Sequence, residues 1–175
     1  MDEIIKMLDE KTINSRTVEL AEEINKDYEG EELLVVPVLN GGFMIASELI
    51  KRLTVPVTLD FVIISSYKDD TISSGNVEMI KDLDTEVAGK NVLLIDDIID
   101  SGRTLAYLKE NLNRRGPKSI SICTLLDKPE RREMDIDSDY VGFTIENEFV
   151  IGYGLDYKGL YRNLPYVGKI KKKEF

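Results

Sequence analysis

Three apolar runs, each closed by a turn, dominate the middle of this 175-residue chain. The runs are Leu33 to Leu39, Asn91 to Ile95 and Ser119 to Leu125. The first of them is a continuous apolar run, as expected for a strand that is buried on both faces of a parallel sheet, and the other two also read as buried strands. Helical spacing follows the first run from Phe43 to Leu53 and the second from about Thr104 to Arg114. The alternation predicts an α/β fold, a mostly parallel twisted sheet flanked by helices.

The segments around these runs are less regular. Two helical patterns open the chain, around residues 2–10 and 14–28, and the second follows Asn14 and Ser15, which can cap a helix. Short strands are expected at residues 57–66, 77–81, 141–143, 149–151 and 167–170. We find no repeat and no linker, so we expect one domain over residues 1–175.

The chain contains no histidine and only one cysteine, Cys123. The missing imidazole excludes Ser–His–Asp and Cys–His catalysis and an HExxH zinc site. Proton transfer near neutral pH must therefore use a carboxylate, a lysine, a tyrosine or the thiol. Cys123 lies in the third apolar run, so we expect it to be a small core residue in a reducing, cytoplasmic setting.

The formal net charge of −10 restricts the partners of the protein. Nucleic-acid backbones demand clustered Lys and Arg, and the one basic run, residues 169–173, lies at the C-terminus. No apolar run approaches the ~20 residues of a membrane span. We therefore expect neither a nucleic acid nor a membrane as a partner.

The most informative segment follows the second apolar run. Asp96 and Asp97 come directly after it, Asp100 is next, and Ser-Gly-Arg-Thr then opens a helix. The glycine, the hydroxyls and the helix N-terminus form an anion site, whereas the carboxylates suit sugar hydroxyls, Mg²⁺ or a base. A Walker P-loop is excluded, because it needs a glycine at position 97. Helix electrostatics alone explain one aspartate at a helix start but hardly three.

This segment resembles the phosphoribosyl-pyrophosphate (PRPP) motif of type I phosphoribosyltransferases. The resemblance implies that the acidic pair contacts the ribose hydroxyls or the metal, and that the next loop wraps the 5′-phosphate. The implied PRPP-binding residues are Asp96, Asp97, Ile98, Ile99, Asp100, Ser101, Gly102, Arg103 and Thr104. The family's fold is also implied, with a small hood or base-binding subdomain formed by N- and C-terminal segments.

Two further turns resemble the hypoxanthine-guanine branch of that family. Asn40, Gly41 and Gly42 follow the first run and resemble a Leu-Lys-Gly-Gly turn that binds pyrophosphate and carries a cis peptide bond. Asn40 stands where lysine is common, which removes a cationic contact but leaves the backbone donors. Ser66 and Tyr67 fall in a segment that resembles the branch's mobile hood loop, whose closure would exclude water.

The string from Phe149 to Pro165 is similar to the same branch almost residue for residue. The resemblance implies that Phe149 stacks on the purine and that Val150 meets the edge of the base. Asp156 would lie near the metal and the exocyclic edge, and Arg162 would bind pyrophosphate. Lys128, after the third run, would donate to the 6-oxo group of the purine. An aromatic face suits a flat heterocycle, and a guanidinium suits pyrophosphate.

The resemblance implies a purine-salvage enzyme that transfers phosphoribosyl from PRPP to N9 of hypoxanthine or guanine, giving IMP or GMP and pyrophosphate. Its implied cofactor is Mg²⁺, near Asp96, Asp97 and Asp156. Asp100 is our candidate for the catalytic base that accepts the purine N7 proton, and a homodimer or homotetramer is expected. Two alternatives stay open: a xanthine-preferring enzyme, and a PRPP- or nucleotide-sensing regulator on the same fold.

Overall fold

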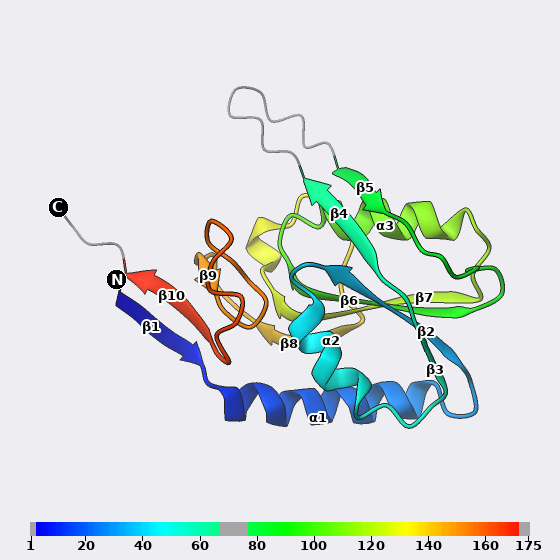
Figure 1. The fold of residues 1–175 in the computed structure, drawn as a ribbon, viewed down its shortest axis with the longest axis horizontal. Helices are drawn as coiled ribbons and strands as arrows, with labels where there is room; N and C mark the ends of the chain where they lie inside the picture. The colour runs from blue at the N-terminus through cyan, green and yellow to red at the C-terminus, as the bar shows by residue number, and fades with distance from the viewer. Residues whose placement is uncertain (1–2, 67–76, 172–175) are drawn as a thin grey trace.

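A computed structural model describes residues 3–66 and 77–171, and its main element is a twisted sheet (Figure 1). The strands of this sheet are β2 (Leu33–Leu39), β3 (Val57–Leu59), β4 (Val62–Ser66), β5 (Val77–Lys81), β6 (Asn91–Ile99), β7 (Ser119–Asp127) and β8 (Tyr140–Thr144). The order is β5-β4-β2-β6-β7-β8, and β3 also pairs with β2. Only the β4–β5 pairing is antiparallel within this described sheet. The prediction of a mostly parallel α/β sheet is confirmed.

Helices cover both faces of the main sheet. They are α1 (Glu10–Asp27), α2 (Phe43–Ile50) and α3 (Arg103–Asn113). Leu93 and Ile95 of β6 pack in one core with α1 and α2, whereas Leu94 packs in a second core with α3. Since both faces of the central strands are buried, their sequences are largely apolar. Cys123 is fully buried in the first core, as predicted.

A smaller sheet joins the two ends of the described chain (Figure 1). It consists of β1 (Glu3–Leu8), β10 (Val167–Lys171) and β9 (Val150–Ile151), all antiparallel. The predicted helix at residues 2–10 is therefore wrong, because β10 supplies a strand partner that the local pattern does not reveal. The second helix begins earlier than predicted, since Asp9 caps it by accepting the Thr12 N–H at 2.8 Å.

The boundaries of several elements also differ from the prediction. The strand β6 continues to Ile99 instead of ending at Ile95, because β7 keeps pairing with it as far as Ile99 and Asp127. The β-rich stretch 57–66 divides into β3 and β4 around Asp60. Helix α2 ends at Ile50, before the predicted Leu53. The extension of β6 matters most, because it places the acidic pair inside a strand. Within the described ranges, no helix is both long and apolar enough to span a membrane.

Candidate active site

Two adjacent carboxylates lie near the carboxyl end of β6. Asp96 and Asp97 are both 8% exposed, and Asp96 Oδ1 accepts the Asp97 N–H at 2.9 Å. Burial, with the charge of Asp97 as a second cause, raises the pKa of the Asp96 carboxyl well above its ordinary value. Burial also raises the pKa of Asp97, against the opposing effect of Asp96's hydrogen bond and the Arg162 charge. Such a pair is stable as anions only beside a cation or hydroxyl donors, so it fits a sugar or a hard metal ion.

The glycine turn after β2 packs directly on this acidic pair. The Leu39–Asn40 peptide bond is cis, as the resemblance implied. A Cβ on Gly41 would lie 1.9 Å from Asp97 Oδ2, and one on Gly42 would lie 2.6 Å from a carbonyl oxygen of β6. Side chains do not fit at either distance, so the turn needs glycine at both positions. The turn thereby brings the predicted pyrophosphate-binding backbone against the carboxylate of Asp97.

The loop that contains Gly154 and Arg162 also packs against this turn. A Cβ on Gly154 would lie 2.1 Å from the carbonyl oxygen of Gly41. Arg162 Nη1 donates to Gly154 O at 2.6 Å, and its Nη2 forms an ion pair with Asp156 Oδ1 at 2.8 Å. The charge of Arg162 also acts on the carboxyl of Asp97. The structure thus brings together Asp97, the glycine turn and Arg162, which the sequence places far apart.

The loop between β6 and α3 holds the predicted phosphate site. Gly102 has φ +83° and caps α3, which begins at Arg103. Ser101 Oγ accepts the Arg103 N–H at 3.4 Å, and the carbonyl of Ser101 accepts the Glu133 N–H at 2.9 Å. Thr104 lies in the first turn of the helix. Free N–H groups and the helix dipole make such an N-terminus favourable for phosphate.

Ile98 and Ile99, between the acidic pair and this loop, point their side chains toward opposite hydrophobic cores. Ile99 is 1% exposed in the α3-side core, and Ile98 packs against the other core. The Ile99 side chain is therefore closed to a ligand, whereas the Ile98 side chain is only partly buried. The carbonyl of Ile99 already accepts the Lys128 N–H at 3.0 Å.

The predicted purine-binding residues come from two segments. Lys128 directly follows β7, at the start of a short 3₁₀ helix (Pro129–Arg131), and is 7% exposed. Burial lowers the pKa of its ammonium group, and the charge of Asp100 opposes this effect. Phe149 is 58% exposed and meets Tyr157 edge to face, with ring centroids 5.6 Å apart. Val150 is buried in β9. The exposed Phe149 ring is thus available for stacking on a flat base.

The carboxylates near the end of β6 are the candidate ligands for Mg²⁺. No three acidic, cysteine or histidine groups of the described residues lie close enough to form an all-protein metal site. Mg²⁺ usually takes one or two carboxylates and completes its shell with water and substrate phosphates. Asp96 and Asp97 offer two such carboxylates, while Asp156 is already paired with Arg162 and accepts the Gly159 N–H. The residues present therefore fit Mg²⁺ bound together with a phosphorylated substrate.

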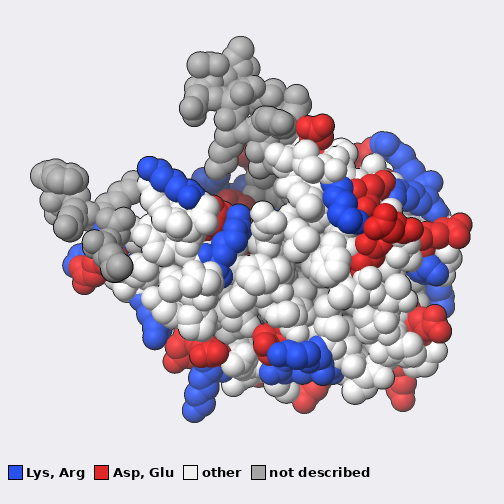
Figure 2. Space-filling view, viewed as in Figure 1, with Lys and Arg blue, Asp and Glu red and all other residues white. Residues whose placement is uncertain are grey.

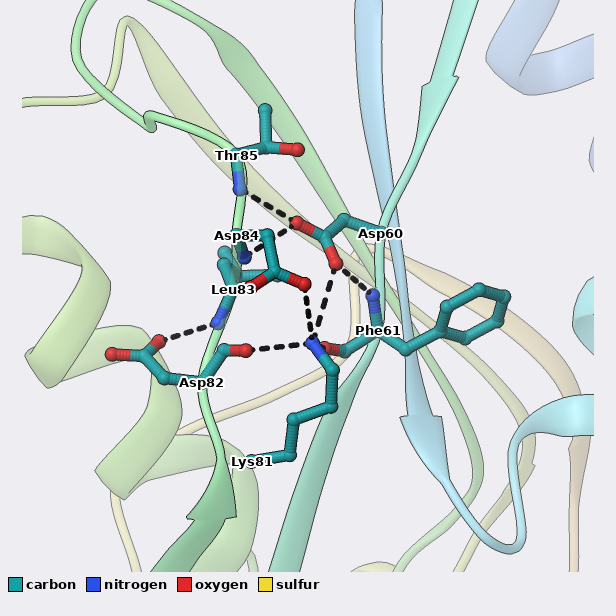
Figure 3. A network of polar contacts seen from close by, with 7 residues as sticks. All are labelled: Asp60, Phe61, Lys81, Asp82, Leu83, Asp84 and Thr85. Atoms are coloured by element: carbon teal, nitrogen blue, oxygen red, sulfur yellow. Dashed lines mark hydrogen bonds and ion pairs between the residues drawn. The ribbon is translucent and has the colours of Figure 1, made fainter.

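A polar network fixes the base of the β4–β5 hairpin (Figure 3). Asp60 accepts the backbone N–H groups of Phe61, Asp84 and Thr85 at 2.7, 2.9 and 2.8 Å. Lys81 lies 3.6 Å from the Asp60 carboxylate and donates to Phe61 O at 3.1 Å. The network anchors the hairpin from which the predicted hood begins. Ser66 ends β4, and Tyr67 lies outside the described residues.

Acidic and basic side chains lie side by side on the face shown in Figure 2. Acidic groups gather where α3 and the segment after β5 lie, and basic groups border them. Arg115 of the α3 end donates to Asp82 Oδ2 at 2.8 Å, so one such contact ties these two segments together. Some acidic groups of this surface are therefore paired with basic ones.

Two arginines escaped the sequence analysis. Arg131 Nε donates to Asp100 Oδ1 at 3.1 Å, and Arg132 Nη1 donates to Asp100 O at 2.8 Å. Arg131 ends the short 3₁₀ helix after Lys128 and Arg132 follows it, and no periodic sequence pattern marks a contact there. The adjacent basic pair after Lys-Pro was the available signal, and its partners became clear only from the fold.

Comparisons with known proteins agree with this geometry. A model of the phosphoribosyl transferase domain matches residues 6–158. The chain belongs to the phosphoribosyltransferase family. The hypoxanthine-guanine phosphoribosyltransferase of Streptococcus thermophilus (strain CNRZ 1066) is 46% identical over 167 residues, 95% of this chain and 93% of the relative. The enzyme of that name from Lactococcus lactis is 49% identical over 169 residues, 97% of this chain and 92% of the relative.

Solved structures show that this phosphoribosyltransferase has the type I fold of its family. A hypoxanthine-guanine phosphoribosyltransferase from Bacillus anthracis, with a HEPES molecule in its active site, superposes with a TM-score of 0.92 at 45% identity. The match covers 97% of this chain and 100% of that one. A hypoxanthine phosphoribosyltransferase from Staphylococcus aureus gives a TM-score of 0.91 at 47% identity, over 95% of this chain and 90% of the other.

Proposed function

We propose that this phosphoribosyltransferase transfers the 5-phosphoribosyl group of PRPP to N9 of hypoxanthine or guanine, which gives IMP or GMP and pyrophosphate. The observation that carries the proposal is the meeting of Asp97, the Gly41 turn and Arg162 at the edge where β6 also presents a phosphate loop. Relatives named hypoxanthine-guanine phosphoribosyltransferase, matched over nearly the whole chain, support the choice of base.

The substrate PRPP would lie along the carboxyl edge of the main sheet. The N-terminus of α3 and the Ser101 hydroxyl bind the 5′-phosphate, and the backbone of the Gly41 turn binds the pyrophosphate together with Arg162. Asp96 and Asp97 accept hydrogen bonds from the ribose hydroxyls. When bound, Mg²⁺ would supply positive charge to the departing pyrophosphate. We propose that Asp96 and Asp97 hold it, and Asp156 would join them only by leaving its pair with Arg162.

The reaction breaks the bond between ribose C1 and the pyrophosphate oxygen and forms the bond between C1 and purine N9. Positive charge develops at C1, and the buried carboxylates stabilise it. The purine loses the proton on N7, and the Asp100 carboxylate accepts it. Asp100 is 40% exposed at its side chain and its carboxylate is held by Arg131, so it lies at the surface of the site with a fixed orientation.

The choice of base depends on Lys128 and Phe149. Lys128 donates to the 6-oxo group, and Phe149 stacks on the ring. Adenine presents an amino donor at the 6-position, which would leave two donors facing each other, so it is rejected. Hypoxanthine and guanine share the 6-oxo edge and are both accepted.

Initial rates with hypoxanthine, guanine, xanthine and adenine, each with PRPP and Mg²⁺, test this proposal. We expect turnover of hypoxanthine or guanine and none of adenine. A clear preference for xanthine would favour the xanthine enzyme instead. An absence of turnover with every base, combined with salt-sensitive RNA binding, would favour a regulator on the same fold.

We also propose a cytoplasmic setting and a homodimer or homotetramer. The buried free thiol of Cys123 suits a reducing compartment. Light scattering of the purified protein measures the oligomeric state, and a monomeric mass across the tested concentrations would contradict it.

A further inference from the structure

Arg132 lies between the two strand ends that carry the candidate catalytic groups. Its side chain is 12% exposed, although it belongs to an irregular surface segment. On the β6 side, its Nη1 donates to Asp100 O at 2.8 Å and to Ile99 O at 3.3 Å. These two carbonyls hold the backbone from which the Asp100 carboxylate projects. Arg132 therefore contacts the peptide groups of the proton acceptor without competing for its side chain.

The same guanidinium reaches the end of β7. Its Nη2 pairs with Asp127 Oδ1 at 2.5 Å, and its Nη1 is 3.5 Å from Lys128 O. Its Nε donates to Ile136 O at 2.8 Å, so it also binds the segment that follows the 3₁₀ helix. The Asp127 side chain is only 14% exposed, so the ion pair is largely withdrawn from water. Lys128 follows Asp127 directly, so the ion pair between Arg132 and Asp127 also restricts the position of the Lys128 backbone.

Only an arginine can make this set of contacts. The planar guanidinium offers five N–H donors in a fixed fork, whereas lysine offers one small ammonium head. The acceptors here come from two different strand ends and from the segment that follows β7. A single rigid plane therefore adds to the backbone bond from Lys128 N–H to Ile99 O in setting the separation between the two loops.

We propose that Arg132 is a positioning residue that holds Asp100 and Lys128 at a fixed separation, so that one bound purine meets both groups. Arg132 touches neither the base nor PRPP; it acts through the backbone that carries the two groups. The inference rests on the proposed function, because it assigns Asp100 to the N7 proton and Lys128 to the 6-oxo group.

The chain offers a matched control in Arg16, whose guanidinium is used in the same way elsewhere. Arg16 donates to the carbonyls of Val141 and Gly142 at 2.8 and 3.1 Å and pairs with Glu19 and Glu23. These contacts join α1 to β8 and touch none of the site loops. Loss of the Arg16 guanidinium therefore removes a comparable set of bonds with no route to the purine.

The test compares Arg132→Ala, Arg132→Lys and Arg16→Ala with the wild type. We expect Arg132→Ala to lower kcat by about 10²-fold, the effect of a misplacement of about 1 Å, and to raise the KM for hypoxanthine. Added methylguanidine should restore part of the turnover of Arg132→Ala and none in the other proteins. Arg132→Lys keeps the pair with Asp127 and should fold, but its kcat should stay low. Arg16→Ala should lose thermal stability and keep wild-type kcat and KM.

Three results would overturn the inference. Wild-type kcat and KM in Arg132→Lys would show that the fork is not needed, even if Arg132→Ala fails to fold. Equal kinetic losses in Arg132→Ala and Arg16→Ala would show that Arg132 contributes only to the stability of the fold. A folded Arg132→Ala that methylguanidine does not rescue would contradict the positioning by the guanidinium. If the wild type itself turns over no 6-oxopurine, the proposed function has failed and the role of Arg132 falls with it.

Discussion

The substitution Gly41→Ala tests whether the turn after β2 and the acidic pair form one binding surface. A Cβ at this position would lie 1.9 Å from Asp97 Oδ2 and 2.4 Å from Asp97 Cγ. Non-bonded heavy atoms prefer separations of about 3.5–4 Å, so the carboxylate must move by more than about 1 Å. The substitution therefore displaces Asp97 without changing its chemistry.

The kinetic effect should exceed the effect on stability. Misplacement of a reacting group by about 1 Å costs about 10²-fold in rate, which is about 2.7 kcal/mol of transition-state stabilisation. The added methyl meets the end of a side chain and not the backbone. We therefore expect the loss in unfolding free energy to lie near the lower end of the ~1–3 kcal/mol typical of overpacking.

The assay measures kcat/KM for PRPP with saturating hypoxanthine, together with thermal unfolding. Gly116→Ala is the control, because Gly116 has φ +72° and nothing within 4 Å of its added Cβ. That change should cost about 1–2 kcal/mol through the backbone alone and leave the kinetics unaltered. Wild-type kcat/KM in Gly41→Ala would refute the contact between the turn and Asp97 as a part of the active site.

Three further predictions concern single groups. Asp60→Asn should lower the free energy of unfolding by about 2 kcal/mol in urea titrations, because an amide cannot replace a carboxylate that accepts three backbone N–H groups. Burial opposes the charged form of Asp60, but these hydrogen bonds outweigh it and hold the pKa of its carboxyl below the ordinary value. The stability difference should therefore be full above about pH 4 and shrink as the pH falls through the folded-state pKa; a constant difference would contradict this. Lys128→Ala should raise the KM for hypoxanthine and narrow its preference over adenine, and undiminished discrimination would remove Lys128 from base recognition. Burial raises the pKa of the Cys123 thiol to about 12, so Ellman's reagent should label it only after unfolding; rapid labelling of the folded protein would be inconsistent with its burial.

The central strands could be predicted because strands buried on both faces consist mostly of apolar residues, which the local sequence shows directly. Both faces of β2, β6 and β7 meet helices, so most residues in their runs are apolar. The strand β1 could not be predicted in this way, because its partner β10 lies at the other end of the described chain. The end of β6 was also missed, since charged residues at Asp96 and Asp97 look like a turn until β7 is seen to pair beside them.

The candidate site residues could be proposed as a set from the sequence, but the contacts among them could not. The acidic pair and the phosphate loop form one contiguous segment, so a sequence motif carries them. The approach of Gly154 to Gly41 depends on how two distant loops fold against each other. Tyr153 has φ +51° although it is not glycine, and no local rule predicts such a residue. Arg132 was missed for the same reason, because its acceptors belong to other segments.

The most direct measurement compares the wild type with Asp100→Asn for both IMP formation and PRPP affinity. On this account the wild type forms IMP from hypoxanthine, PRPP and Mg²⁺. Asp100→Asn turns over about 10²–10⁴-fold more slowly, because the amide cannot accept the N7 proton, while its Kd for PRPP stays close to that of the wild type. Undiminished turnover in Asp100→Asn, or a wild type that forms no IMP, would contradict the account.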